Sequence, residues 1–273
     1  MNDFVIRTIW SNEITPEEIK DFRFVLNSVF NNNFCTEEYF KAKYLDNIYG
    51  PSLHFLAYSG NKPVGAMALW RNDIGGREAY QNADISVLQD FRKNGVFGSI
   101  LKREEDFIST KKGILFYVFP NHNSFPSFVR AGWQVKTYYR KRFIPGISSE
   151  KQLSHIDPDY AKWWLIRRAG ICHIRRKTDY YLIVQRIQRT SGFNWIIGRT
   201  DEKTARLFPE SKSLNWILYA SSDKRPLFDL NPDSGLLNNP DHVVFRNVLN
   251  PPEIPVWKKD SIKGRSFRGI FSH

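Results

Sequence analysis

The chain has 273 residues, of which 41% are hydrophobic and 25% charged, and its net charge is +12. These values are ordinary for a soluble globular protein with one large or two small domains. The start lacks the basic and apolar segments of a secretory signal, and no apolar run approaches the roughly 18 residues of a membrane-spanning helix. The two cysteines belong to no ligand-spaced cluster, so we expect a cytoplasmic protein without a metal.

The positive charge is concentrated in the second half of the chain. Residues 1–145 carry 19 Lys or Arg against 15 Asp or Glu, whereas residues 146–273 carry 21 against 13. Such a surplus suits anionic partners, which include nucleic acid, phosphorylated cofactors and acidic membrane surfaces.

The first half of the chain predicts a strand, two helices and an antiparallel hairpin. Thr15 and Glu18 form a capping box at the start of the first helix, and Thr36 precedes the second. The strands are predicted at residues 4–10, 53–58 and 63–70.

The pattern from residue 81 to 88 predicts a half-buried strand. Ala83, Ile85 and Val87 alternate with Asp84 and Ser86, so we expect the two sets to lie on opposite faces.

An amphipathic helix is predicted next, at residues 96–110, with the charged block 102–106 facing outward. A strand covered on both faces (114–119), a short helix (124–130) and further strand (134–142) complete this half. A linker near residue 146 predicts two domains, 1–146 and 147–273. Beyond it we expect strands at 180–187, 193–198, 214–220 and 243–248, with a helix at 201–208.

The segment from Arg92 to Gly98 connects a strand end to the first turn of a helix. Backbone N–H groups at a helix start have no partners within the helix, and the helix dipole adds partial positive charge there. Gly95 lets a bulky anion approach the backbone, and Gly98 keeps the first turn open. The segment therefore predicts a pyrophosphate site, although a corner that only solves backbone geometry would have the same glycines.

Two motifs in this half resemble those of the GCN5-related N-acetyltransferases. The strand-and-loop motif V-x-P-x-x-R-x-x-G-x-G/A is matched by Val87, Arg92 and Gly95, with Gln89 in place of Pro and Phe97 in place of Gly or Ala. The following motif, N-x-x-A/S and then G-F, is met by Asn121, Ser124 and the pair Gly132-Trp133.

This resemblance implies an α/β (α+β) fold with a mixed central sheet flanked by helices, and an acyl-CoA co-substrate. The pantetheine arm would lie between two splayed strands and the pyrophosphate would bind the loop amides. A backbone N–H near Val87 would hold the oxyanion. The residues implied to contact the co-substrate are Val87, Leu88, Gln89, Arg92, Lys93, Asn94, Gly95, Val96, Phe97, Gly98, Asn121, Ser124 and Phe128.

Proton transfer is less well defined by the sequence. The family often has a Tyr four residues before the G-F pair to protonate the leaving thiolate, and that position is Phe128 here. Another group replaces it, or the thiolate leaves unprotonated. Asp84 is the candidate base, acting through water, and His122 is the alternative. Each also has a purely structural interpretation, as a surface residue or a hydrogen-bond acceptor.

The second half contains a basic, aromatic stretch that begins at Trp163-Trp164 and ends at Lys177. It is interpreted as a surface for a sugar or anionic acceptor, as a nucleic-acid surface, or as a helix with its aromatic residues in the core. The order of elements resembles a degenerate second acetyltransferase lobe that would shape the acceptor cleft. A weaker resemblance of residues 40–52 to surface-polysaccharide enzymes favours an amino sugar or sugar nucleotide as the amine acceptor. The alternatives are a protein or peptide amine, and a non-catalytic module that binds nucleic acid.

Overall fold

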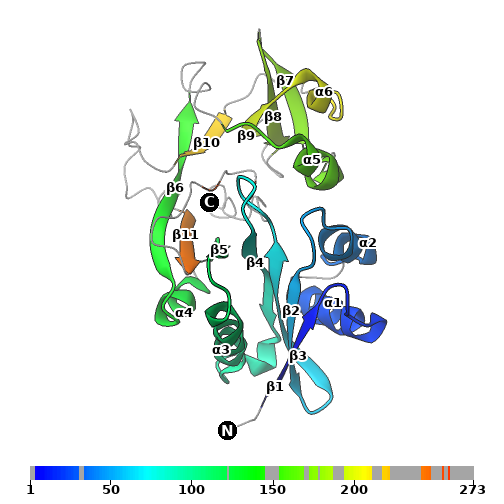
Figure 1. Ribbon diagram of the computed structural model, residues 1–273, viewed down its shortest axis with the longest axis vertical. Coiled ribbons are helices and arrows are strands. Elements are labelled where there is room, and N and C mark those ends of the chain that lie inside the picture. The colour runs from blue at the N-terminus through cyan, green and yellow to red at the C-terminus, as the bar shows by residue number, and fades with distance from the viewer. Residues whose placement is uncertain are drawn as a thin grey trace, which may run out of the picture. The chain divides into compact units, whose positions relative to one another are not determined.

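Figure 1 shows a computed structural model of the chain. It describes residues 4–30, 34–121, 123–144, 154–168, 172–177, 179–186, 194–210, 217–221, 241–246, 254 and 258. The chain separates into two compact units, Met1–Lys136 with Val243–Pro252, and Thr137–His242 with Glu253–His273. The predicted linker near residue 146 lies outside the described residues. The first unit ends at Lys136 and also includes Val243–Pro252 from near the end of the chain. No local sequence pattern indicated that this segment belongs to the first unit.

The first unit is a mixed sheet with helices on both faces, as the sequence predicted (Figure 1). The sheet order is β1-β2-β3-β4-β5-β11, in which only β4 and β5 pair in parallel. Its strands are β1 (Val5–Trp10), β2 (Leu53–Ser59), β3 (Lys62–Arg71), β4 (Ala79–Val87), β5 (Leu115–Val118) and β11 (Asp241–Arg246). Its helices are α1 (Pro16–Phe30), α2 (Glu37–Phe40), a π-helical turn (Lys41–Leu45), a 3-10 turn (Gln89–Phe91), α3 (Val96–Ser109) and α4 (Phe125–Arg130).

The predicted helix starts are confirmed by their hydrogen bonds. Glu18 accepts from the backbone N–H of Thr15 at 2.9 Å, and the Thr15 hydroxyl accepts from the amide of Glu18 at 3.3 Å. The Thr36 hydroxyl accepts from the amide of Tyr39 at 3.1 Å. Each cap satisfies amides that the helix itself leaves unpaired, so these starts are decided locally.

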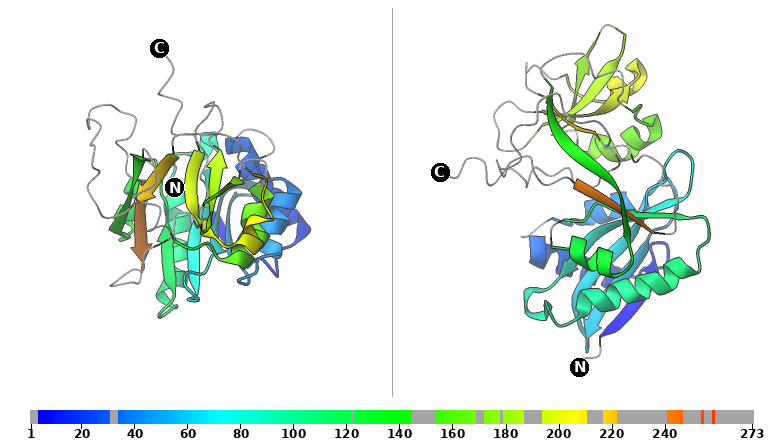
Figure 2. Two further views of the ribbon diagram at one scale, coloured as in Figure 1. Left: turned by 90° about the horizontal axis from the view of Figure 1, so that it is seen from above. Right: turned by 90° about the vertical axis from the view of Figure 1, so that its left-hand side faces the viewer.

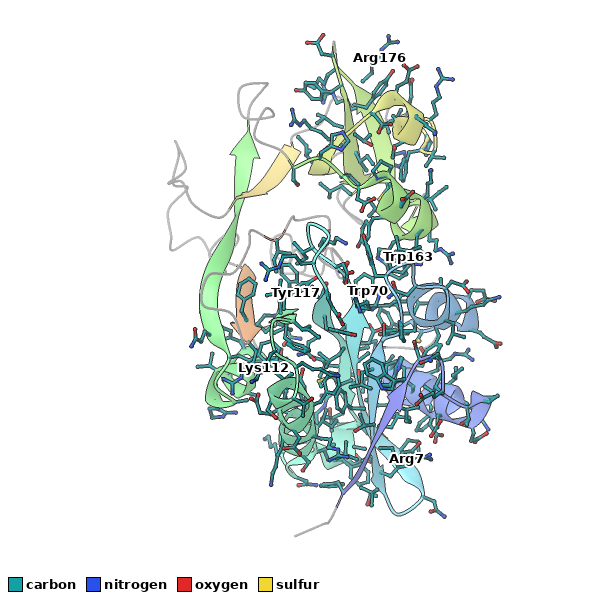
Figure 3. The ribbon with its side chains drawn as sticks, in the orientation of Figure 1. Arg7, Trp70, Lys112, Tyr117, Trp163 and Arg176 are labelled. Atoms are coloured by element: carbon teal, nitrogen blue, oxygen red, sulfur yellow. The ribbon has the colours of Figure 1, made fainter. Side chains whose placement is uncertain are left out.

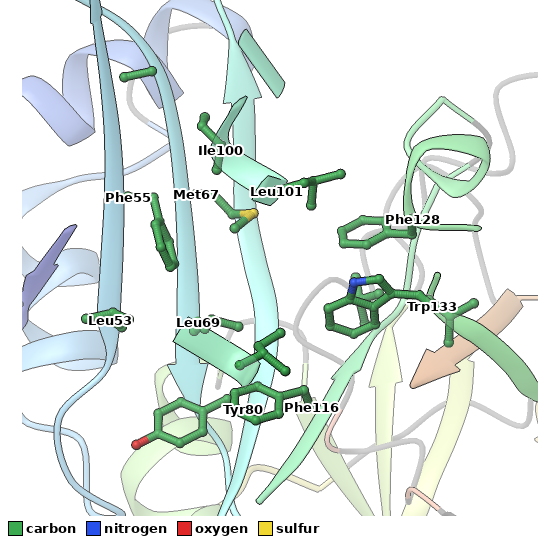
Figure 4. Packing of buried hydrophobic residues seen from close by; sticks show 14 of the residues in the cluster. Leu53, Phe55, Met67, Leu69, Tyr80, Ile100, Leu101, Phe116, Phe128 and Trp133 are labelled. Carbon is green, nitrogen blue, oxygen red and sulfur yellow. The ribbon is translucent and has the colours of Figure 1, made fainter. Parts of the chain in front are cut away.

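Helix α3 packs on one face of the sheet, as the right-hand view of Figure 2 shows. The core beneath it (Figure 4) contains buried side chains from β2, β3, β5 and α4, among them Phe55, Met67, Phe116 and Phe128. The close approach of α3 to β3 requires a glycine at position 65, because a Cβ there would lie 2.8 Å from Val96 Cγ1. The first turn of α3 is therefore pressed against the sheet.

The predicted alternation in β4 is wrong at one point, because the strand contains a β-bulge. Ala83 pairs with Ala68 and Ser86 with Ala66, so β4 has one residue more than β3 between these pairs. Cross-strand partners share a face, which places Ala83 with Ser86 rather than with Ile85. Ile85 and Val87 pack on the α3 core as expected.

The expectation of an outward-facing charged block in α3 holds for Lys102, Arg103 and Asp106, which are exposed, and is wrong for Glu104. Glu104 is fully buried, where its Oε1 accepts from Asn82 Nδ2 at 2.6 Å. Burial raises the pKa of Glu104 to about 8, the hydrogen bond from Asn82 opposes the rise, and the charge of Glu105 adds to it. Glu104 therefore joins β4 to α3 as a neutral acid at pH 7.

The opposite face of the sheet is covered by α1 and α2 over an aromatic cluster. His54 on β2 is fully buried against the rings of Phe22, Phe40 and Tyr44, at centroid distances of 4.5 to 5.3 Å. Burial lowers the pKa of His54 to about 3, so this imidazole is neutral and acts as a core side chain.

The second unit contains a small sheet and short helices. Strands β7 (Cys172–Arg176), β8 (Tyr181–Arg186) and β9 (Asn194–Thr200) are antiparallel. β10 (Ile217–Ser221) runs parallel to β9 and antiparallel to the end of β6 (Gln134–Ile144). The helical pieces are α5 (Pro158–Tyr160), a π-helical turn (Ala161–Leu165), a 3-10 turn (Ile166–Arg168) and α6 (Glu202–Ala205). β7 and α5 were not predicted from the sequence.

Glu104→Gln tests the buried acid through the pH dependence of stability. The folded protein keeps the Glu104 proton up to about pH 8, whereas an unfolded Glu loses it near pH 4.3. The native state therefore loses stability as the pH rises through this window, and the variant does not. Relative to the original protein, we expect the unfolding free energy of the variant to rise by about 2 kcal/mol between pH 5 and pH 7.

Urea denaturation at the two pH values measures this difference, with the exposed Glu17→Gln as the control. Parallel pH profiles for Glu104→Gln and the original protein would show that Glu104 is ionised in the folded state.

Candidate acyl-CoA site at the end of strand β4

The site begins where β4 parts from β5. The two strands pair from Ala79 with Leu115 to Asn82 with Val118, and the pairing stops there although β4 continues to Val87. β4 keeps its other edge, since Ser86 and Val87 still pair with β3. The backbone of residues 83–87 therefore offers an unpaired edge toward β5, where a ligand with amide groups could hydrogen-bond.

The predicted phosphate loop lies directly beyond this edge. Gly95 is the N-cap of the 14-residue helix α3 and has a φ of +87°, a conformation that favours glycine. Lys93 also has a positive φ, of +67°. Within the described part of the chain, the backbone N–H groups of residues 93–98 have no hydrogen-bond acceptor. These amides and the positive end of the helix dipole form an array that suits an anion.

The side chains of the loop differ in how they are held. Arg92 Nε donates to the carbonyl of Val87 at 3.1 Å, which folds its guanidinium back over the strand end. The amide of Leu88 donates to the Val64 carbonyl at 2.9 Å, while Gln89 and Lys93 are exposed. Asn94 Nδ2 lies 3.4 Å from the Asp90 carbonyl.

Phe97 and Phe128, where the sequence departs from the family motifs, contact each other. Their rings form an edge-to-face pair with centroids 5.7 Å apart, and Phe128 also packs against Trp133 at 5.2 Å. Phe128 is 0% exposed. The position that would hold a thiol-protonating Tyr is therefore part of the core.

The start of α4 is formed by the second predicted motif. Asn121 Oδ1 accepts from the amides of Asn123 and Ser124 at 2.9 and 3.0 Å. The side-chain oxygen thus orders the helix start, while its Nδ2 is the group with which Asn121 could donate to a ligand. His122, the alternative base, lies outside the described residues.

Asp84, the candidate base, occupies the β4 bulge with a φ of +50°. Its side chain is 4% exposed and forms an ion pair with Lys43, whose Nζ lies 3.0 Å from Asp84 Oδ2. The Tyr44 hydroxyl donates to the same oxygen at 2.6 Å, and the Tyr39 hydroxyl lies 3.3 Å from both carboxylate oxygens. The bulge has turned Asp84 toward α2 and the π-helical turn.

The Lys43 side chain is 0% exposed and is surrounded by aromatic rings. Its Nζ lies 5.2, 5.3 and 5.0 Å from the ring centroids of Tyr39, Tyr44 and Trp70. Trp70, labelled in Figure 3, also donates from Nε1 to the Lys43 carbonyl at 3.2 Å. The sequence gives little sign of this burial, because a Lys in a helix is usually solvent-exposed. The aromatic pair Phe40 and Tyr44, one turn apart, is the signal that this helix packs against the core.

The thiol of Cys35 interacts electrostatically with the carboxylate of Asp84. Burial raises the pKa of the Cys35 thiol well above its usual range, and the negative charge of Asp84 raises it further. A thiol held neutral is a poor nucleophile, so we assign Cys35 to packing.

The aromatic part of the basic stretch in the second unit is buried. Trp163 and Trp164 are 6% and 4% exposed, with their rings 5.6 Å apart, and Trp163 also contacts Tyr160. Arg176, labelled with Trp163 in Figure 3, is exposed at the end of β7. Of the three interpretations, this geometry favours core packing for the tryptophans. It leaves the arginine-rich strand available to an anion.

The described residues contain no helix long and apolar enough to cross a membrane. Within the same residues, no group of three His, Cys, Asp or Glu side chains is placed to bind a metal ion.

The arrangement of the chain resembles that of several solved structures. A probable N-acyltransferase from Enterococcus faecalis V583 matches with a TM-score of 0.55 and 13% identity over 89% of this chain and 72% of that one. A GCN5-related N-acetyltransferase from Anabaena variabilis ATCC 29413 matches with a TM-score of 0.54 and 14% identity over 88% and 72%. Eis1 from Mycobacterium abscessus matches with a TM-score of 0.53 and 13% identity over 89% and 73%.

No protein-family model and no curated protein matches the sequence. Identities this low establish a shared fold. The chain therefore has the fold of the GCN5-related N-acetyltransferases, as its motifs predicted. The degenerate second lobe stays a prediction.

Lys43→Met tests the buried ion pair. Removing the ammonium leaves the Asp84 carboxylate buried without its cation, which costs about 3–5 kcal/mol of unfolding free energy. Adding Asp84→Asn removes the uncompensated charge and recovers part of the loss. Urea denaturation of the two single variants and the double variant measures this coupling.

Lys20→Met is the control, because Lys20 forms an exposed ion pair with Glu17 and its loss should leave stability unchanged. If the losses of unfolding free energy in the two single variants add up to the loss in the double variant, Lys43 and Asp84 do not interact.

Proposed function

We propose that this protein is an acyl-CoA-dependent N-acyltransferase. The observation that carries the proposal is the position of the anion-binding array. The amides of residues 93–98 lie immediately past the unpaired edge of β4. A ligand with a pyrophosphate at one end and an amide-containing arm at the other fits this order of groups, and acyl-CoA is such a ligand.

The loop amides and the unpaired edge of β4 suggest a binding role for each part of acyl-CoA. The pyrophosphate would bind the amides at the start of α3, with Arg92 and Lys93 supplying positive charge. The pantetheine arm would lie between β4 and β5 and pair with the unpaired edge of β4 that ends at Val87, with Leu88 and Gln89 directly beyond it. Asn121 would donate from Nδ2 to the same arm. Ser124, the residue before α4, would contribute to the wall. Phe128, in contrast, is enclosed by Phe97 and Trp133 and would not contact the ligand, so the sequence prediction for this residue is wrong.

The chemistry is direct transfer to an amine. The amine nitrogen attacks the thioester carbonyl, a C–N bond forms, the C–S bond breaks, and CoA leaves as the thiolate. A backbone N–H near Val87 would hold the oxyanion. Burial of Phe128 in an apolar cluster favours departure of the thiolate without an acid from this position. The amine proton is lost to Asp84 in the simplest scheme. The half-buried Tyr39 would connect Asp84 to the substrate side, because the carboxylate itself is enclosed.

The acceptor we propose is an amino sugar or a sugar nucleotide in the cytoplasm. The support is the resemblance of residues 40–52 to surface-polysaccharide enzymes, whose acceptors are amino sugars. Release of free thiol from acetyl-CoA, measured with glucosamine, a lysine peptide and spermidine in parallel, distinguishes a sugar acceptor from a protein or polyamine acceptor.

Acetyl-CoA is expected to raise the melting temperature, because a ligand that binds only the folded state stabilises it. At about 100 times its Kd the gain is ~2.7 kcal/mol. Thermal denaturation with saturating acetyl-CoA measures the shift. If acetyl-CoA has no effect while an oligonucleotide binds with an affinity that falls steeply with salt, the protein is a nucleic-acid-binding module instead.

Gly98→Leu tests the binding array. An added Cβ meets nothing within 4 Å of Gly98, and Leu is a better helix former, so we expect unchanged or higher stability. The side chain would occupy the space over the amides and weaken acetyl-CoA binding at least tenfold. Isothermal titration calorimetry measures the affinity, with Ser109→Ala at the other end of α3 as the control. Equal affinity in Gly98→Leu and the original protein would place the phosphates elsewhere.

A further inference from the structure

The buried pair Lys43–Asp84 joins two backbone irregularities. Lys43 lies in the π-helical turn, closed by the hydrogen bond from the Asp46 amide to the Lys41 carbonyl at 2.8 Å. Asp84 lies in the β4 bulge with its positive φ. Each irregularity inserts one residue, and each turns a charged side chain into the sheet face beneath α2.

The bulge lies where β4 leaves β5. The last β4–β5 pair is Asn82 with Val118, and Asp84 follows two residues later. A bulge bends its strand and ends pairing on one side, so the bulge at Asp84 is positioned to start the separation of the strands. After the bulge, Ile85 and Val87 point into the α3 core, which fixes the strand that continues to the phosphate loop.

A non-glycine residue with positive φ persists only where its surroundings impose it. At Asp84 those surroundings are the Lys43 ammonium at 3.0 Å, the Tyr44 hydroxyl at 2.6 Å and the Tyr39 hydroxyl at 3.3 Å. Lys43 Nζ also donates to Tyr39 Oη at 2.9 Å, and this ties the donors to one another. The carboxylate is therefore held at a fixed point, and the backbone of residue 84 must follow it.

We propose that Lys43 and Asp84 are a positioning pair, whose contact imposes the bulge and thereby keeps open the edge of β4 that binds the acyl-CoA arm. The inference rests on the proposed function, since it assigns a role in binding the same co-substrate. It makes the backbone conformation of residue 84, rather than its carboxylate, the feature that acyl-CoA binding needs.

The test replaces the ion pair while varying only the backbone preference at position 84. Lys43→Met/Asp84→Gly and Lys43→Met/Asp84→Ala both lack the charges, but glycine adopts a positive φ readily and alanine does not. The affinity for acetyl-CoA is measured by calorimetry at a temperature where circular dichroism shows both variants fully folded. We expect the glycine variant to bind within threefold of the original protein and the alanine variant at least tenfold more weakly than the glycine variant.

A purely structural role would lower the melting temperature of both variants without separating their affinities. Equal affinities, whether retained or lost together, overturn the inference. If the alanine variant does not fold, Asp84→Asn and Asp84→Ser in the same Lys43→Met background replace the comparison, because Asn tolerates a positive φ better than Ser. Failure of the original protein to bind acetyl-CoA would instead refute the proposed function.

Discussion

The first unit depends on one geometric constraint: β4 must leave β5 while it remains hydrogen-bonded to β3. A strand that simply diverged would lose pairing on both edges and leave buried amides without partners. Here β3 keeps its pairs with Ser86 and Val87, and the other edge alone is given up beyond Asn82. The extra residue of the bulge makes this possible, because it bends one strand without breaking the ladder behind it.

Holding the end of β4 in this position requires buried charged groups, and the side chains around them offset the cost of burying those charges. A lysine and an aspartate are buried together, which is unfavourable unless both charges are paired and hydrogen-bonded. Two tyrosine hydroxyls and three aromatic rings meet this condition around Lys43 and Asp84. On the other face of the same strand, Glu104 and Asn82 tie β4 to α3 through a second buried polar contact. The unpaired edge of β4 therefore lies between two buried polar contacts within an otherwise apolar core.

The two departures from the family motifs are related to each other. Phe97 takes the place of a small residue in the first turn of α3, and Phe128 takes the place of a hydroxyl donor on α4. In the folded chain they form one edge-to-face contact that closes onto Trp133. A Tyr at position 128 would have to bury its hydroxyl in this apolar cluster, so a large residue at 97 and an apolar residue at 128 fit together. The two substitutions therefore complement each other in packing.

The sequence by itself determined the local features of this protein. The Thr15–Glu18 box, the Thr36 cap, the hairpin before β4, the glycine at the start of α3 and the order of elements in the first half could be predicted, because each depends on residues within a few positions of one another. Tertiary structure alone decided which charges are buried, where the alternation of β4 breaks, and that β11 returns to the first unit. Charged residue types such as Lys43, Asp84 and Glu104 usually lie on the surface. Their burial becomes favourable only through partners that are far away in the sequence. For that reason the glycine loop at the start of α3 could be predicted from the sequence, whereas the buried pair Lys43–Asp84 could not.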